Sequence, residues 1–176
     1  MSEAEHTMVH FIHLIAFVLL GNKMSKQPQA LADEDFKKVE EAIKDVIEEG
    51  RNIRSTFESY YEEKIDISWE VDAAVEAFSI FSSRWTIEIL TTLYIAGDRR
   101  FNELRKLLRG ISSRTLSDKL TKCTETGLVE RVVETDKSPI RVTYRLTEHG
   151  RRCGQLLGPL VAYQKIKQGR VVRHSI

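Results

Sequence analysis

Residues 101–147 constrain the fold of this chain more than any other stretch. They contain two short amphipathic segments separated by Gly110 and Ile111, then Gly127, then two β-rich runs around a polar loop. This order predicts a helix-turn-helix followed by a β-wing. A helix held in such a unit has a diameter that suits the major groove of duplex DNA.

The second amphipathic segment has signals for both ends of a helix. Ser112 is a suitable N-cap, because its hydroxyl can accept a hydrogen bond from a free N–H group of the first turn. Gly127 stands where a left-handed C-cap residue is needed. Leu116, Leu120 and Cys123 recur at i, i+4 and i+7, so we expect them to form one buried stripe.

The face opposite this stripe is polar and consists of Arg114, Asp118 and Thr121, with Ser113, Ser117 and Lys122 on its flanks. Any surface helix has a polar face, so this pattern alone fits a solvated helix equally well. The basic residues around the first segment favour nucleic acid, because cationic side chains neutralise phosphates and release counterions. They are Arg99, Arg100, Arg105, Lys106 and Arg109.

Two β-rich runs, residues 128–134 and 141–146, enclose residues 135–139, which suit a wing tip. We expect a recognition helix over about 112–126 in the major groove and a wing over about 134–141 on the backbone or minor groove. Arg114 is the candidate for a guanine contact. The candidates for phosphate contacts are Arg100, Arg105, Lys106, Lys119, Lys137 and Arg141. The other candidate DNA-binding residues are Ser112, Ser113, Thr115, Ser117, Asp118, Thr121 and Lys122.

Charge is distributed unevenly along the chain, although the net charge is only +1. Residues 33–79 contain 6 Lys and Arg against 15 Asp and Glu, whereas residues 97–152 contain 14 against 8. Residues 153–176 add four basic residues and no Asp or Glu. A basic segment that would contact DNA, attached to an acidic segment, favours DNA binding. A surface with separated charges also suits head-to-tail contacts between proteins.

From residue 72 to about 163 the chain resembles the HxlR-type regulators, within the wider MarR-like winged-helix group. The resemblance rests on residues 83–87 (SRWTI), 99–104 (RRFNEL), 110–117 (GISSRTLS), 126–131 (TGLVER) and 144–150 (YRLTEHG). It implies a homodimeric, sequence-specific DNA-binding regulator of transcription. It also implies that the final helix and the segment before Trp85 form the dimer interface.

One position departs from the family pattern. Many members carry a cysteine about thirteen residues before the tryptophan, and in a subgroup it senses oxidants or electrophiles; here that position is Asp72. We expect both cysteines of this chain, Cys123 and Cys153, to be structural, since nothing in the sequence predicts a low thiol pKa. Two cysteines without local pairing also suit a reducing compartment, so a cytoplasmic, nucleoid-associated protein is expected.

The acidic segment has a seven-residue apolar spacing, carried by Phe36, Val39, Ile43, Val46, Ile53, Phe57 and Tyr60. Gly50 interrupts the spacing, so the segment is either one nearly continuous helix with a weak point or two helices, the second over 51–64. We favour the continuous helix. One narrow stripe cannot form a core alone, so the segment is expected to serve dimerisation, with an intramolecular buttress as the alternative.

The N-terminal residues 8–20 are mostly apolar but shorter than the ~20 residues needed to span a bilayer. Glu3 and Glu5 precede them, which argues against a secretory signal. These residues form an extra helix that packs on a partner or, since Met24 is a plausible start, residues 1–23 do not belong to the native protein. A membrane anchor is a third option.

The expected fold is mainly α with a small β-wing. It comprises an N-terminal extension (1–32), an acidic helical segment (33–66), a winged helix-turn-helix domain (67–167) and a basic tail (168–176). The tail either adds non-specific nucleic-acid affinity or is solvated. The last helix is expected to begin after an N-cap at Thr147, to run to about Lys167, to kink at Pro159 and to carry Leu156, Leu157, Leu160 and Val161 on one side.

The expected core places Ala77, Phe78, Phe81, Trp85, Ile89, Leu90 and Leu93 against Phe101, Leu104, Leu107 or Leu108, Leu116, Leu120 and Leu128. Gly-rich phosphate loops, zinc-ligand spacing and a recognisable nucleophile motif are absent from the sequence. We therefore predict a protein that is not an enzyme and uses no cofactor or metal. The alternative function is a winged-helix protein-interaction module without specific DNA binding. The sequence does not decide whether a small-molecule effector binds at the dimer interface.

Overall fold

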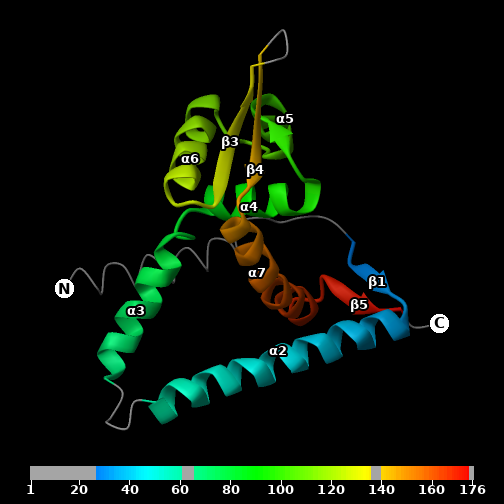
Figure 1. Cartoon of the computed structure of the whole chain (residues 1–176). Coiled ribbons are helices and arrows are strands. Elements are labelled where there is room, and N and C mark those ends of the chain that lie inside the picture. The colour runs from blue at the N-terminus through cyan, green and yellow to red at the C-terminus, as the bar shows by residue number, and fades with distance from the viewer. Residues whose placement is uncertain (1–26, 61–65, 136–139, 175–176) are drawn as a thin grey trace. The chain divides into compact units, whose positions relative to one another are not determined.

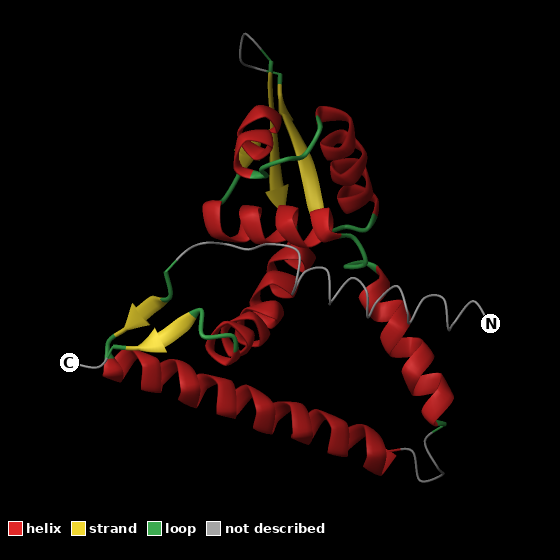
Figure 2. Ribbon diagram, turned by 180° about the vertical axis from the view of Figure 1, so that it is seen from behind, coloured by secondary structure: helices red, strands yellow, loops and turns green. Residues whose placement is uncertain are grey.

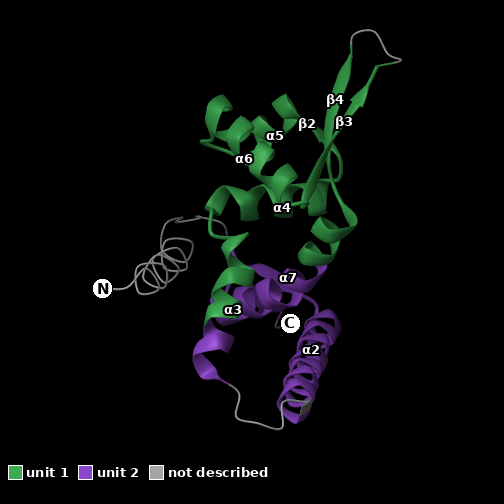
Figure 3. Ribbon diagram, turned by 60° about the vertical axis from the view of Figure 1, so that its left-hand side comes forward, with its two compact units in different colours: residues 1–22, 72–154 green, residues 23–71, 155–176 purple. Residues whose placement is uncertain are grey.

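The computed structural model describes residues 27–60, 66–135 and 140–174 (Figure 1). The described chain divides into two compact units, one of residues 72–154 and the other of residues 27–71 and 155–174 (Figure 3). Helices α3 and α7 each begin in one unit and end in the other.

The first unit contains the predicted helix-turn-helix and wing. Its elements are α3 (Ile67–Ser79, from residue 72 on), α4 (Arg84–Ala96), β2 (Arg99–Arg100), α5 (Phe101–Leu107), α6 (Ser113–Glu125), β3 (Val129–Glu134), β4 (Arg141–Leu146) and the start of α7 (Glu148–Lys167). The sheet order is β2-β4-β3, and both pairings are antiparallel. The strand β2 was not predicted, whereas the bounds of the two helices and the two wing strands agree with the sequence to within one or two residues.

The core of this unit is formed by one face of each of its central helices and by the start of the wing. Its fully buried side chains are Ile89, Leu90, Leu104, Leu116, Leu120, Cys123, Leu128 and Val129. Leu108, just past the end of α5, is buried, whereas Leu107 is exposed. The prediction that Ala77 and Phe78 are buried is wrong, because α3 contributes no fully buried side chain to this core. Phe81, Trp85 and Phe101 are half-buried.

The end of α6 is closed by a Schellman motif at Gly127. Gly127 has a φ of 69°, the Leu128 N–H donates to the Cys123 carbonyl (2.9 Å), and the Gly127 N–H donates to the Thr124 carbonyl (3.1 Å). This is the pairing that satisfies the last carbonyls of a helix, and it confirms the predicted C-cap.

The start of α7 packs against the same turn. The Thr147 hydroxyl accepts a hydrogen bond from the Gly150 N–H (3.0 Å), which confirms the predicted N-cap, and the Thr147 N–H donates to the Leu128 carbonyl (3.1 Å). A Cβ at Gly150 would lie 2.0 Å from that carbonyl oxygen. The predicted end of this helix at Lys167 is confirmed, and the kink at Pro159 stays a prediction.

The second unit is built on α2 (Asp33–Tyr60), which continues through Gly50 without a break. The continuous helix that the sequence favoured is therefore confirmed. Two short strands, β1 (Gln29–Leu31) and β5 (Val171–Arg173), pair in parallel beside the first turns of α2 (Figure 2). Neither strand was predicted, since they lie in segments interpreted as an extension and a tail.

Arg173 ties the C-terminal strand to α2. Its guanidinium lies 3.2 Å from the Asp33 carboxylate and 3.1 Å from that of Glu40, and it stacks over the Phe36 ring at 5.0 Å. Arg173 is exposed and forms ion pairs with two carboxylates of α2, and the nucleic-acid affinity of the tail stays a prediction.

Replacing Gly150 with alanine is expected to destabilise the protein by about 1–3 kcal/mol, the usual cost of overpacking, because its Cβ would meet a backbone oxygen rather than a side chain that can move. Gly50→Ala, in the interior of the helix α2, is the matched control. Nothing lies within 4 Å of a Cβ there, and alanine favours a helix interior by about 0.5–1 kcal/mol. Urea unfolding of both variants measures the difference, and equal stability would contradict the packing described above.

Candidate nucleic-acid interface

The orientation of α6 is fixed at its N-terminus and along its buried stripe. The Ser112 hydroxyl accepts a hydrogen bond from the Thr115 N–H (3.0 Å) and lies 2.8 Å from the Thr115 hydroxyl. Leu116 and Leu120 are at most 2% exposed. Because side chains advance by about 100° per residue around a helix, the residues midway between these leucines must face away from the core.

The outward face of α6 is formed by Arg114, Ser117, Asp118 and Thr121, all of them exposed. In the described part of the chain, neither Arg114 nor Asp118 forms an ion pair. The Thr121 hydroxyl donates to the Ser117 carbonyl (3.1 Å), which holds its oxygen close to the helix. The face therefore offers one guanidinium, one carboxylate and short hydroxyls to a ligand.

The helix α5 is linked to the first turn of α6 by a side-chain hydrogen bond. Arg105 Nη1 donates to Ser113 Oγ at 2.8 Å. At the other end of α5, Glu103 Oε2 accepts a hydrogen bond from the Arg100 N–H (2.7 Å) and closes the first turn. The exposed cations Arg105 and Lys106 consequently belong to a helix whose N-terminus and position relative to α6 are both fixed, and Arg100 immediately precedes that helix.

The wing carries charges of both signs. Arg141 is exposed at the start of β4 and pairs in register with Glu134. Across the same sheet, Arg145 Nε lies 2.6 Å from Glu130 Oε1, and this hydrogen bond raises the pKa of Arg145. The predicted wing-tip residue Lys137 lies outside the described residues.

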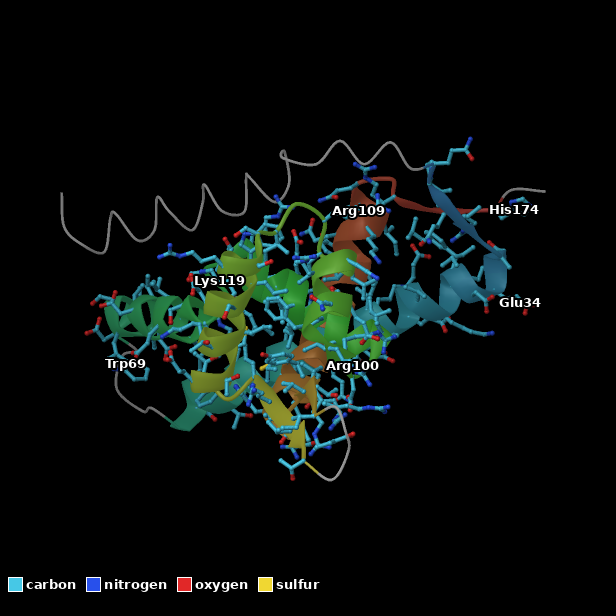
Figure 4. The ribbon with its side chains drawn as sticks, turned by 90° about the horizontal axis from the view of Figure 1, so that it is seen from above. Glu34, Trp69, Arg100, Arg109, Lys119 and His174 are labelled. Carbon is cyan, nitrogen blue, oxygen red and sulfur yellow. The ribbon has the colours of Figure 1, made fainter. Side chains whose placement is uncertain are left out.

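Most of the predicted contact residues are exposed on the first unit. The exposed ones are Arg100, Arg105, Lys106, Ser112, Ser113, Arg114, Ser117, Asp118, Thr121, Lys122 and Arg141, whereas Thr115 and Lys119 are half-buried. Lys122 Nζ forms an ion pair with Glu125 Oε2 at 3.7 Å. Arg100 is at the end of β2, Arg109 is in the turn between α5 and α6, and Lys119 is on α6 (Figure 4).

Two further exposed guanidinium groups lie outside the predicted contact residues, although one of them, Arg109, is among the basic residues that favour nucleic acid. Arg109 is exposed in the turn between α5 and α6, and Arg131 is exposed on β3. The signal for Arg109 was present in the sequence, since it precedes the glycine that closes the turn. Arg131 alternates with the half-buried Glu130 and Val132 on β3, and that alternation places it on the open face of the strand.

The two cysteines have different surroundings. Cys123 is 1% exposed, and burial raises the pKa of its thiol to about 11. Cys153 is half-buried, 3.8 Å from the nearer ring nitrogen of His149, and burial raises its thiol pKa as well. Neither thiol is activated, because a reactive cysteine needs a lowered pKa.

Near neutral pH, iodoacetamide is expected to alkylate Cys153 slowly in the native protein and to reach Cys123 only after denaturation. The reagent attacks the thiolate, which burial disfavours at both sites and most strongly at Cys123. Peptide mass spectrometry reports both sites, with Cys153→Ser as the control that isolates Cys123. Native Cys123 reacting as fast as Cys153 would refute the structural role of this thiol.

The described residues hold no group of three or more metal-binding side chains. No helix within the described ranges is long and apolar enough to cross a membrane. The apolar residues 8–20 fall outside those ranges.

Comparison with known proteins places the matching region on the winged unit and α7. Residues 80–170 match the family described as HxlR-like helix-turn-helix. The HTH-type transcriptional regulator YvaP of Bacillus subtilis (strain 168) is 34% identical over 85 residues, which are 48% of this chain and 77% of YvaP. YodB, another HTH-type transcriptional regulator of that organism, is 35% identical over 74 residues, 42% of this chain and 64% of YodB.

The fold has a counterpart among solved structures. A transcriptional regulator of the MarR family from Enterococcus faecalis V583 matches with 28% identity and a TM-score of 0.50, covering 60% of this chain and 91% of its own. Residues 29–60, which contain β1 and α2, lie outside the family match.

Proposed function

Because the chain belongs to the family of HxlR-like helix-turn-helix transcriptional regulators, we propose that it binds a specific sequence of duplex DNA as a homodimer. Each protomer places α6 in a major groove and its wing on the neighbouring backbone or minor groove. The supporting observation is the outward face of α6, where Arg114 and Asp118 are exposed and unpaired among the described residues. Such a protein acts in the cytoplasm, at the nucleoid.

Specific and non-specific contacts are assigned to different residues in this proposal. Arg114 lies in the first turn of α6, where a guanidinium can donate two hydrogen bonds to guanine O6 and N7. The phosphates are held by Arg100, Arg105, Lys106, Lys119, Lys137 and Arg141. Arg105 has a double role, because the guanidinium that bonds Ser113 has further N–H groups available for a phosphate.

Arg114→Ala is expected to weaken binding to the operator by about 1–3 kcal/mol, a factor of about 5 to 150, while binding to unrelated DNA is largely kept. Lys106→Ala is expected to weaken binding to every sequence and to reduce the salt slope by about one. Genome-wide footprinting of the purified protein supplies the operator, and fluorescence anisotropy at several salt concentrations measures both variants. Equal losses of specific and non-specific binding in Arg114→Ala would count against the assignment.

The proposed dimer uses the N-terminal helical segment and the final helix. Phe36, near the start of α2, is buried, but Val46, Ile53 and Phe57 further along the same stripe are 49–56% exposed. On α7, Leu156 is 78% exposed, and Leu160 and Val161 are about half exposed. Apolar side chains that are aligned on one face and open to solvent are typical of surfaces that pair with another protein. In the proposed dimer, a second copy of the chain covers these side chains on both helices.

Ile53→Glu is expected to weaken self-association at least tenfold, about 1.4 kcal/mol, because it places a charge in the apolar stripe of α2. Ser55→Glu is the matched control, since the exposed Ser55 lies off this stripe on the same helix. Sedimentation equilibrium of the full chain measures the dimer constant. A monomeric native protein at tens of micromolar, or equal constants for the two variants, would contradict this interface.

A further inference from the structure

Asp118 is an acidic residue at the centre of a surface assigned to DNA. We propose that it determines sequence specificity by accepting a hydrogen bond from the amino group of a cytosine in the half-site. The inference rests on the proposed DNA-binding function. It adds a base contact made by a negatively charged residue to the guanine contact made by the positively charged Arg114.

The position of Asp118 on α6 follows from the burial of its neighbours. Leu116 is 0% exposed and Leu120 is 2% exposed, and Asp118 lies midway between them in sequence, so it lies on the opposite side of the helix. It is exposed, one turn after the exposed Arg114. When the N-terminal half of α6 enters a groove, Asp118 faces the base edges together with Arg114.

Among the residues that the structure describes, the carboxylate of Asp118 has no ion-pair partner, whereas three acidic residues near it each have a hydrogen-bond or ion-pair partner. Glu103 accepts from the Arg100 N–H, Glu125 is 3.7 Å from Lys122, and Glu130 is 2.6 Å from Arg145. Within the described residues, Asp118 takes part in no ion pair. Its charge is therefore open to a ligand.

A bare carboxylate in a groove lined by phosphates weakens binding to every sequence unless it meets a hydrogen-bond donor. An ionised carboxylate only accepts hydrogen bonds. In the major groove the base donors are the cytosine N4 and adenine N6 amino groups, and adenine also presents its N7 acceptor beside N6. The second carboxylate oxygen would be repelled by that N7 lone pair, so cytosine is the better partner.

The spacing of the two residues limits the spacing of the two bases. Four residues of helix rise by about 6 Å, and successive base pairs are about 3.4 Å apart. The cytosine read by Asp118 therefore lies within about two base pairs of the guanine read by Arg114.

The test is selection from a randomised duplex library by the full chain, by Asp118→Asn and by the control Glu125→Gln. The control removes one carboxylate charge from the same helix at a site that already has a partner. The wild-type protein is expected to select guanine and cytosine at this spacing. Asp118→Asn is expected to lose the cytosine preference by about tenfold and to gain adenine, since an amide can pair with both N6 and N7. Glu125→Gln is expected to keep both preferences.

A second measurement needs no variant: replacing the cytosine pair in the selected site with each other pair is expected to weaken wild-type binding about tenfold. Unchanged cytosine selection by Asp118→Asn, or loss of guanine instead of cytosine, would overturn the inference. The latter result would make Asp118 a positioning residue for Arg114. If the wild-type protein selects no sequence at all, the proposed function itself fails.

Discussion

The burial of one stripe of α6 is the constraint on which the rest of the interface depends. Leu116, Leu120 and Cys123 are each at most 2% exposed, and α4 packs against this helix. Rotation of α6 about its axis would expose these side chains, and fully burying a leucine contributes about 1.5–3 kcal/mol. The rotation of the helix is consequently fixed, and with it the choice of Arg114 and Asp118 as the residues that face outward.

Leu128 connects this helix to the wing and to α7. Its N–H completes the Schellman motif, its side chain is 0% exposed, and its carbonyl oxygen accepts from the Thr147 N–H. The same carbonyl approaches Gly150 so closely that no side chain fits there. One residue thus fixes the end of α6, the start of β3 and the start of α7, so the recognition surface and the wing are held as one body.

The parts of the structure that could be predicted from the sequence are those that depend on interactions between residues close together in the chain. Ser112, Gly127 and Thr147 are terminal signals that act on their own neighbours, so the helix ends they predict are confirmed. The strands β1, β2 and β5 have two or three residues and pair with distant segments, so no local periodicity marks them. Phe78 fits an apolar pattern, yet a pattern does not tell a core face from a face open to solvent. The exposure of the α6 residues could be predicted because their buried neighbours determine it, whereas their roles toward DNA depend on a ligand that the sequence does not contain.

The uneven distribution of charge affects how the outward face of α6 could discriminate between DNA sequences. A reading face made only of cations is attracted to any duplex, and salt weakens all of these contacts alike. The first unit surrounds α6 with cations at its edges, on α5 and in the turn, whereas the outward face of α6 carries hydroxyls and a carboxylate beside the one guanidinium of Arg114. In the proposed function, attraction at the edges brings the helix to DNA, and the repulsion between Asp118 and the phosphates is offset only where a base supplies a hydrogen-bond donor. In the proposed function, Arg114 selects guanine, and Asp118 adds selectivity because it weakens binding to sequences that offer it no hydrogen-bond donor. Adding positive charge at the centre of this face is therefore expected to strengthen binding and to weaken discrimination.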